Sequence, residues 1–161
     1  MTSASKVRQL MVLLGGVLTA LMMSSEAEAS LALVDWNMEA RRNLPLHLKA
    51  WLGAMVLANA ASILFVRKHI AARWVLGAFI VSHTWLAVLE ITGLYTVQGG
   101  LVSLGHILVW APAIIALLKY RSEIALPSAY GIWACVMLFF YGVSLVFDFR
   151  DAFIWLNARV F

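Results

Sequence analysis

The sequence predicts an all-α integral membrane protein, a four-helix transmembrane bundle that follows a signal peptide or an additional first transmembrane helix. Apolar residues make up 63% of the 161-residue chain, charged residues make up only 12%, and the mean hydropathy is +0.90. Soluble domains average about 45–50% apolar and about 25% charged residues. Four apolar segments of at least 18 residues follow residue 43, and each is long enough to cross a bilayer.

The first 29 residues have the composition of a secretory signal peptide. Lys6 and Arg8 precede the 14-residue apolar run Leu10–Met23, and an A-x-A sequence ends at Ala29. A basic start, a short apolar segment and small residues before the cleavage site are typical of such peptides. We therefore expect cleavage after Ala29, and the alternative is that residues 1–29 remain as a first transmembrane helix.

Residues 30–161 are expected to form a single bundle domain. Asn43 is suited to cap the first span, and Pro45 is suited to its first turn. Pro112 interrupts the third span and should kink it. The predicted elements are spans at about 44–66, 73–95, 101–118 and 126–147, followed by a short interfacial helix at about 149–160.

Two less apolar segments are expected to lie at the membrane surface. Residues 31–43 combine Trp36 with several charged side chains and are too polar to span. In the tail, Phe149, Phe153 and Leu156 recur at helical spacing, with polar residues off that stripe. A helix of this kind lies flat in the interface.

The loop charges predict the orientation of the bundle. The loop RKHIAAR at 67–73 and the residues Lys119 and Arg121 are basic, whereas the loop TVQGG at 96–100 carries no charge. Basic loops stay in the cytoplasm, so we expect a multi-pass protein of the bacterial cytoplasmic (inner) membrane with its C-terminus outside. In this setting the formal charge of +4 does not indicate nucleic-acid binding. His69, within the first basic loop, should be solvated.

The span at 73–95 carries two ionisable residues, His83 and Glu90, seven positions apart. Seven residues correspond to nearly two helical turns, so both side chains share a face. The cost of an ionisable group in hydrocarbon should direct that face into the bundle. Across the TVQGG loop, Glu90 and His106 are predicted to form a hydrogen-bonded pair. The predicted polar intramembrane cluster consists of His83, Glu90, His106, Tyr141, Ser144 and Asp148.

This cluster supports several interpretations. Intramembrane polar residues often hold helices together by hydrogen bonds. A proton or cation path could run through Glu90, His106 and His83. Glu90 and His106, with His47 or Asp148, offer metal-ligand types, although they come from separate helices without a local pair motif. A haem between His83 and His106 is disfavoured by a difference in depth of about 10 Å.

Known catalytic motifs are absent from the sequence, which contains no G-x-S-x-G, P-loop, G-x-G-x-x-G or H-E-x-x-H pattern. Cys135 is the single cysteine, which excludes an intrachain disulfide and C-x-x-C chemistry. The small residues Ala54, Ala58 and Ser62 recur every four positions and favour close helix contact. We therefore expect a non-catalytic accessory or interaction subunit without a cofactor. Its expected partners are the lipid bilayer and other membrane subunits or a second copy of the chain.

Overall fold

The computed structural model describes residues 32–93 and 97–160. Within these ranges the ordered elements are all helical, apart from one isolated β-bridge between Asp35 and Gln98. They are α3 (Met38–Arg42), α4 (Leu46–Ala60) continued by the 3₁₀ turn η1 (Ala61–Leu64), α5 (Ile70–Thr92), α6 (Gly99–Lys119), the 3₁₀ turn η2 (Arg121–Glu123) and α7 (Ala129–Val160). The predicted all-α class is confirmed, whereas the predicted leader at 1–29 lies outside the described residues.

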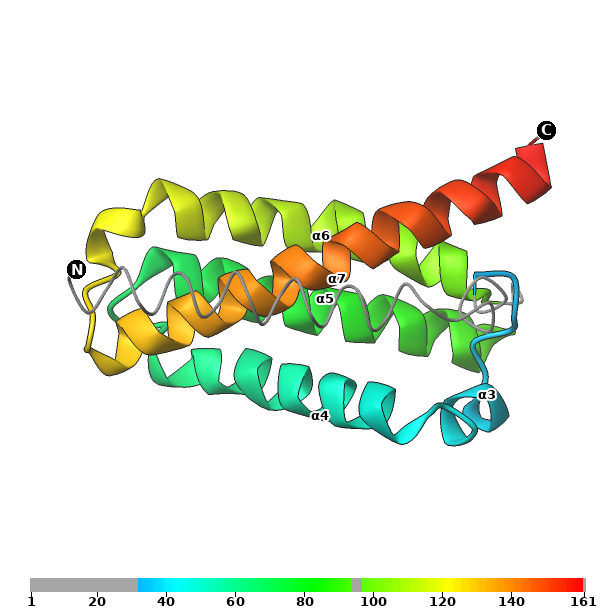
Figure 1. Ribbon diagram of the computed structural model, residues 1–161, viewed down its shortest axis with the longest axis horizontal. Helices are drawn as coiled ribbons and strands as arrows, with labels where there is room; N and C mark the ends of the chain where they lie inside the picture. Colours follow the sequence, from blue (N-terminus) through cyan, green and yellow to red (C-terminus); the bar gives the residue numbers. More distant parts are fainter. Residues whose placement is uncertain (1–31, 94–96, 161) are drawn as a thin grey trace.

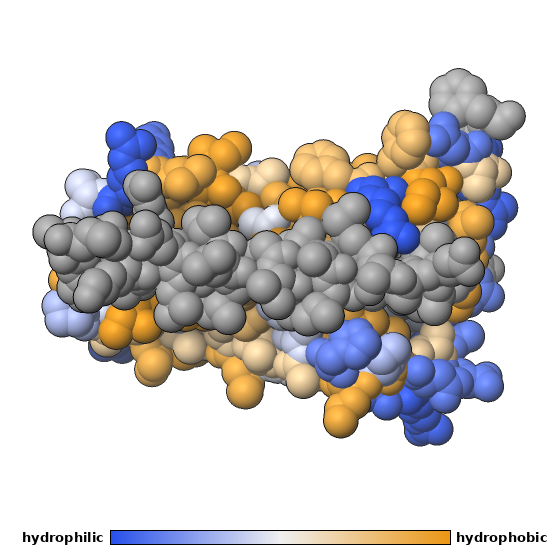
Figure 2. Space-filling view, in the orientation of Figure 1, coloured by the Kyte–Doolittle hydropathy of each residue, from blue (hydrophilic) through white to orange (hydrophobic). Residues whose placement is uncertain are grey.

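Four helical segments are long and apolar enough to cross a membrane: Leu46–Leu64, Ile70–Thr92, Gly99–Lys119 and Ala129–Arg159. They run along the long axis of the molecule (Figure 1). Large apolar side chains remain on the outside, among them Ile91, which is 84% exposed. Figure 2 shows hydrophobic residues between the two ends of this axis and hydrophilic residues concentrated towards the ends. Helices that are apolar on their outer face are typical of membrane spans. The four predicted spans after residue 43 thus correspond to four helices of the described residues that are long and apolar enough to cross a membrane.

The helix ends follow the local sequence. The Asn37 side chain caps α3 by accepting a hydrogen bond from the Ala40 amide at 2.9 Å. Asn43 was predicted to cap the first span but instead ends α3, and Pro45 takes the N-cap position of α4. Gly93 ends α5 with φ of 60°, in the left-handed region that favours glycine.

The core lies between α5, α6 and α7, with α6 and α7 in the most extensive contact. Glycine allows close approach at two points. A Cβ at Gly105 of α6 would lie 2.3 Å from the ring of Trp85 on α5, and one at Gly100 would lie 2.1 Å from Trp155 on α7. The larger buried side chains of the core are Met55, Val75, Trp110, Leu117, Trp133, Met137 and Tyr141.

The structure corrects the prediction of a separate interfacial helix at 149–160. α7 is a single helix from Ala129 to Val160, and its last turns extend past the other helices (Figure 1). Residues 143–160 contain neither glycine nor proline, so nothing in the sequence breaks the helix there. Trp155 Nε1 donates a hydrogen bond to Gln98 Oε1 at 2.9 Å, which fastens this extension to the start of α6.

The segment before α3 pairs with the start of α6. The Gly100 amide donates to the Ala32 carbonyl at 2.8 Å, and the Trp36 amide donates to the Val97 carbonyl at 2.6 Å. These bonds hold α3 and Trp36 at the right-hand end of the bundle in Figure 1, which we call the α3 end. The opposite end, which we call the loop end, carries the loops before α5 and before α7.

Candidate binding pocket

A histidine of α6 and a carboxylate of α7 meet towards the α3 end. His106 Nδ1 lies 3.4 Å from Asp148 Oδ1, and the two side chains are 19% and 11% exposed. This distance is long for a hydrogen bond. The predicted partner of His106 was Glu90, and the structure corrects that pairing. Asp148 reaches His106 because α7 runs beside α6 without a break at residue 148.

Glu90 points away from the core and forms an ion pair with Arg41 of α3. Its side chain is 47% exposed, and that of Arg41 is 38% exposed. Glu90 lies in the last turn of α5, close to where α3 folds against the same end of the bundle. The charge is therefore met by a neighbouring cation at the end of the span instead of by burial against His106.

The other predicted histidines lie apart from His106. His83 is exposed on α5, and its Nδ1 lies 2.9 Å from the Phe79 carbonyl of the same helix. His47 is exposed in the first turn of α4. Of the proposed metal ligands only His106 and Asp148 meet, and the two proposed haem ligands, His83 and His106, lie apart. Across residues 32–93 and 97–160, no group of three or more His, Cys, Asp or Glu side chains is arranged to hold a metal ion.

A stack of aromatic rings continues from His106 into the core. The His106 ring lies 3.9 Å from that of Trp110 with an interplanar angle of 11°, and Trp110 lies 5.0 Å from Tyr141 at 10°. The Tyr141 hydroxyl donates to Asn59 Oδ1 of α4 at 2.5 Å, and Asn59 Nδ2 donates to the Met55 carbonyl at 2.9 Å. This polar and aromatic chain joins α4, α6 and α7.

Of the predicted polar cluster, the structure brings together His106, Tyr141, Ser144 and Asp148, and it leaves out His83 and Glu90. Ser144 Oγ donates to the Met55 sulfur at 3.5 Å. Asn59, which the predicted cluster omitted, is 2% exposed and bonds to Tyr141. A sequence signal for Asn59 existed, because it is the strongly polar residue near the middle of an apolar span.

A half-enclosed cavity of about 170 Å³ lies beside the His106–Asp148 pair. Its walls come from α4, α6, α7 and the segment before α3, and they are mostly apolar. The aromatic residues of the wall are Trp36, Trp51, Trp110 and Phe147, the aliphatic ones and methionine are Leu44, Leu48, Leu52, Met55 and Val102, and the polar ones are Ser103, His106, Ser144, Asp148, Arg150 and Asp151.

A carboxylate oxygen of Asp148 in this wall has no hydrogen-bond partner among the described residues. Asp148 is 8% exposed, and its Oδ2 is buried without a hydrogen bond from any of the residues that the structure describes. A buried acceptor left without a donor costs about 1–3 kcal/mol, and more when it is charged. Asp148 borders the cavity, so the cavity combines an apolar wall with a carboxylate whose hydrogen bonds from the described residues are incomplete.

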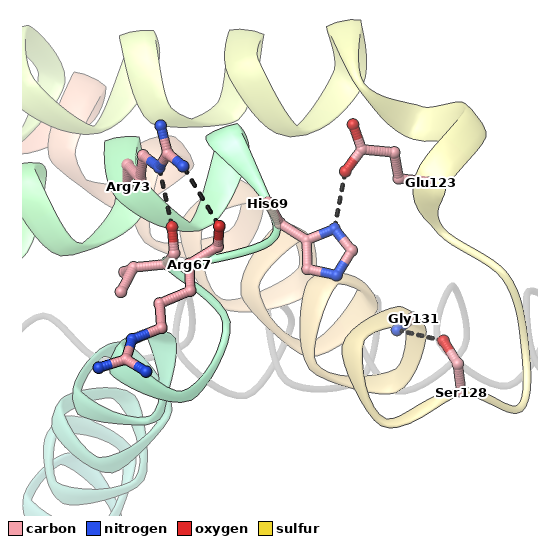
Figure 3. Close-up of polar contacts among 7 residues, drawn as sticks. Arg67, His69, Arg73, Glu123, Ser128 and Gly131 are labelled. Carbon is pink, nitrogen blue, oxygen red and sulfur yellow. Dashed lines mark hydrogen bonds and ion pairs between the residues drawn. The ribbon is translucent and has the colours of Figure 1, made fainter.

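A second polar cluster lies at the loop end and has a structural role (Figure 3). His69 was expected to be solvated, but its ring stacks on Tyr130 at 3.5 Å, and its Nδ1 lies 2.7 Å from Glu123 Oε2. Arg73 Nε donates to the Val66 carbonyl at 2.8 Å. These contacts tie the loop before α5 to η2 and to the first turn of α7.

Comparisons with known proteins return no similarity: no family model matches the chain, and no curated protein or solved structure matches it.

Proposed function

We propose that this protein is a small multi-pass protein of the bacterial cytoplasmic membrane that acts by binding, and that the cavity beside His106 and Asp148 is its ligand site. The observation that carries the proposal is the buried Oδ2 of Asp148, which lacks a donor in the described chain and belongs to the wall of an otherwise apolar cavity. Ligand pockets typically combine apolar walls with a few polar groups.

The size of the cavity limits what enters it. An apolar cavity of about 150 Å³ holds a benzene molecule, so about 170 Å³ suits a ring or a short alkyl segment. The rest of a larger ligand would extend through the open side. A membrane-soluble small molecule fits this description better than a large polar metabolite.

The short loops support an orientation with the α3 end outside, because the connection at 96–100 on that side carries no charge. Arg67, Lys68 and Arg73 lie at the loop end, and so do Lys119 and Arg121. Basic loops stay in the cytoplasm. The pocket would then open in the outer half of the membrane, and the C-terminus would lie outside.

Binding is better supported than proton or cation translocation. A translocation path through Glu90, His106 and His83 needs these groups on one continuous route. His83 and Glu90 are exposed on α5, whereas His106 faces α7. Tyr141 and Asn59 bond to one another in the core, which supports a helix-joining role for them.

A second candidate function, that of an accessory or interaction subunit, is supported by α4. The buried residues of α4 are Met55 and Asn59, so most of this helix faces outward. Its exposed residues include Ala50, Gly53 and Ala54, which would let another membrane helix approach closely. The predicted strip of Ala54, Ala58 and Ser62 does not face one environment. Ser62 is fully buried, and of the three only Ala54 is exposed.

The ligand proposal is tested by native mass spectrometry of the chain extracted from its own membrane in mild detergent. We expect one small molecule bound per chain. Leu48→Trp, which fills the cavity from α4, should remove the adduct, whereas Gly77→Trp should keep it because Gly77 has open space around it. Identical adducts in the wild type and in a folded Leu48→Trp variant would contradict the proposal.

The interaction proposal is tested by cross-linking in native membranes. Gly53→Leu on α4 should reduce cross-links to a partner, and Gly77→Leu on α5 is the matched control, because a Cβ at either glycine meets nothing within 4 Å. Equal cross-linking in both variants, or a chain that never cross-links, would argue against an interface on α4.

A further inference from the structure

The polar end of the ligand follows from the charges that line the cavity. Asp148 and Asp151 contribute two carboxylates to the wall, and Arg150 contributes one guanidinium. The balance disfavours an anionic ligand. His106 Nδ1 already faces Asp148 Oδ1, whereas Asp148 Oδ2 lacks a donor among the described residues.

On the basis of the proposed function, we infer that the ligand carries a hydrogen-bond donor, a hydroxyl or an ammonium group, that reaches Asp148 while its apolar body fills the cavity. A ligand that can only accept hydrogen bonds would leave Oδ2 without a donor, so it would lack this contribution to binding. A carboxylate ligand would place a third negative charge beside Asp148 and Asp151, where like charges repel.

The aromatic residues of the cavity wall favour a ligand whose apolar part is a flat ring. Trp36, Trp51 and Trp110 belong to the wall and come from three different parts of the chain. Aromatic side chains favour stacked or edge contacts with another ring, and indole also attracts a cation. A ligand with a hydroxyl group and one with an ammonium group are therefore both compatible with this wall. Each would need to donate a hydrogen bond to Asp148.

The experiment compares four probes that share one ring and differ in their polar group. They are 4-ethylphenol and 4-ethylbenzylamine, which are donors, 4-ethylanisole, which only accepts, and 4-ethylbenzoate, which is an anion. Dissociation constants are measured on the purified full chain in one detergent. We expect at least one donor probe to bind about tenfold more tightly than 4-ethylanisole, since a hydrogen bond to a charged group contributes at least that factor.

Variants then assign the preference to Asp148. Asp148→Asn should reduce the ratio of donor to anisole affinities, because its amide oxygen is an uncharged acceptor and its N–H groups can donate to the anisole oxygen. Glu39→Gln, which neutralises an exposed carboxylate of α3 outside the wall, should leave the ratio unchanged. If Asp148→Asn does not fold, the ratio for the wild type still tests the inference, with Leu48→Trp as the variant whose cavity is filled.

Three outcomes would overturn it, and they separate the inference from the function on which it depends. If all probes bind equally and Leu48→Trp abolishes binding, the cavity is a ligand site but needs no donor. Tightest binding of 4-ethylbenzoate would assign the cavity to anions. If no probe binds above its partition into micelles, both the inference and the proposed ligand site fall.

Discussion

Asp148 on α7 lies within 3.4 Å of His106 on α6, and the same histidine stacks on Trp110. The pair therefore marks a boundary in the molecule. Towards the core, aromatic and polar contacts join three helices through Tyr141 and Asn59. Towards the α3 end, the pair borders the cavity. Separate predictions follow for the two sides of this boundary.

The bond between Tyr141 and Asn59 should stabilise the bundle. Tyr141→Phe removes the donor and leaves the buried Asn59 Oδ1 unpaired. Hydrogen bonds between membrane helices contribute about 0.6 kcal/mol on average and up to about 1.7 kcal/mol. We expect a coupling energy in this range from a double-mutant cycle with Asn59→Ala, measured by unfolding in mixed micelles. Strictly additive effects would contradict a direct interaction.

Glu90 should contribute little to stability. Its ion pair with Arg41 is exposed, and exposed pairs are worth about 0–1 kcal/mol. Glu90→Gln should therefore leave the free energy of unfolding within about 1 kcal/mol of the wild type. His106→Leu is the comparison, because it leaves the buried Asp148 without its histidine partner. If Glu90→Gln lowers the free energy of unfolding as much as His106→Leu does, Glu90 is buried in the membrane-embedded protein.

Gly105 should tolerate no side chain. Gly105→Ala places a Cβ 2.3 Å from the Trp85 ring, and overpacking of this kind costs about 1–3 kcal/mol. Gly77→Ala on α5 is the control, because its Cβ meets nothing within 4 Å and alanine favours a helix over glycine. Thermal melts should show a lower midpoint for Gly105→Ala and an equal or higher one for Gly77→Ala; the reverse order would contradict the packing of α5 on α6.

The orientation predicts which cysteines react from outside. Cys135→Ala removes the single cysteine, and new cysteines are then placed at the exposed residues Ser122 at the loop end and Asn157 near the end of α7. A membrane-impermeant maleimide applied to intact spheroplasts should label Asn157→Cys and should label Ser122→Cys only after lysis. The opposite pattern would reverse the orientation.

Much of the fold could be predicted because it depends on the length and spacing of apolar segments. The third span was predicted at 101–118 and observed at Gly99–Lys119. The second was predicted at 73–95 and observed at Ile70–Thr92. Hydrophobic length and basic loops report directly on such boundaries.

The direction in which α5 faces could not be deduced from the ionisable residues alone. His83 and Glu90 are both exposed on this helix. The packing face is marked instead by small residues at a spacing of three and four, namely Ala71, Val75, Ala78 and Ser82. At about 100° per residue, His83 and Glu90 lie well off that stripe.

The partners within the site depend on contacts that the sequence pattern does not encode. Arg41 reaches Glu90 only because α3 folds against the end of α5. Asp148 reaches His106 because α7 continues as one helix past the predicted end of its span. Residue counts gave the depth of these groups, but depth alone does not identify a neighbour on another helix.

Titration calorimetry with 4-ethylphenol tests the central claim, that the cavity beside Asp148 takes a ring-sized ligand, most directly. The measurement compares the purified wild-type chain with Leu48→Trp in the same detergent, after melting curves show that both are folded. We predict saturable binding with one site per wild-type chain and only the heat of micelle partition for Leu48→Trp. The same heat for both proteins would contradict the claim.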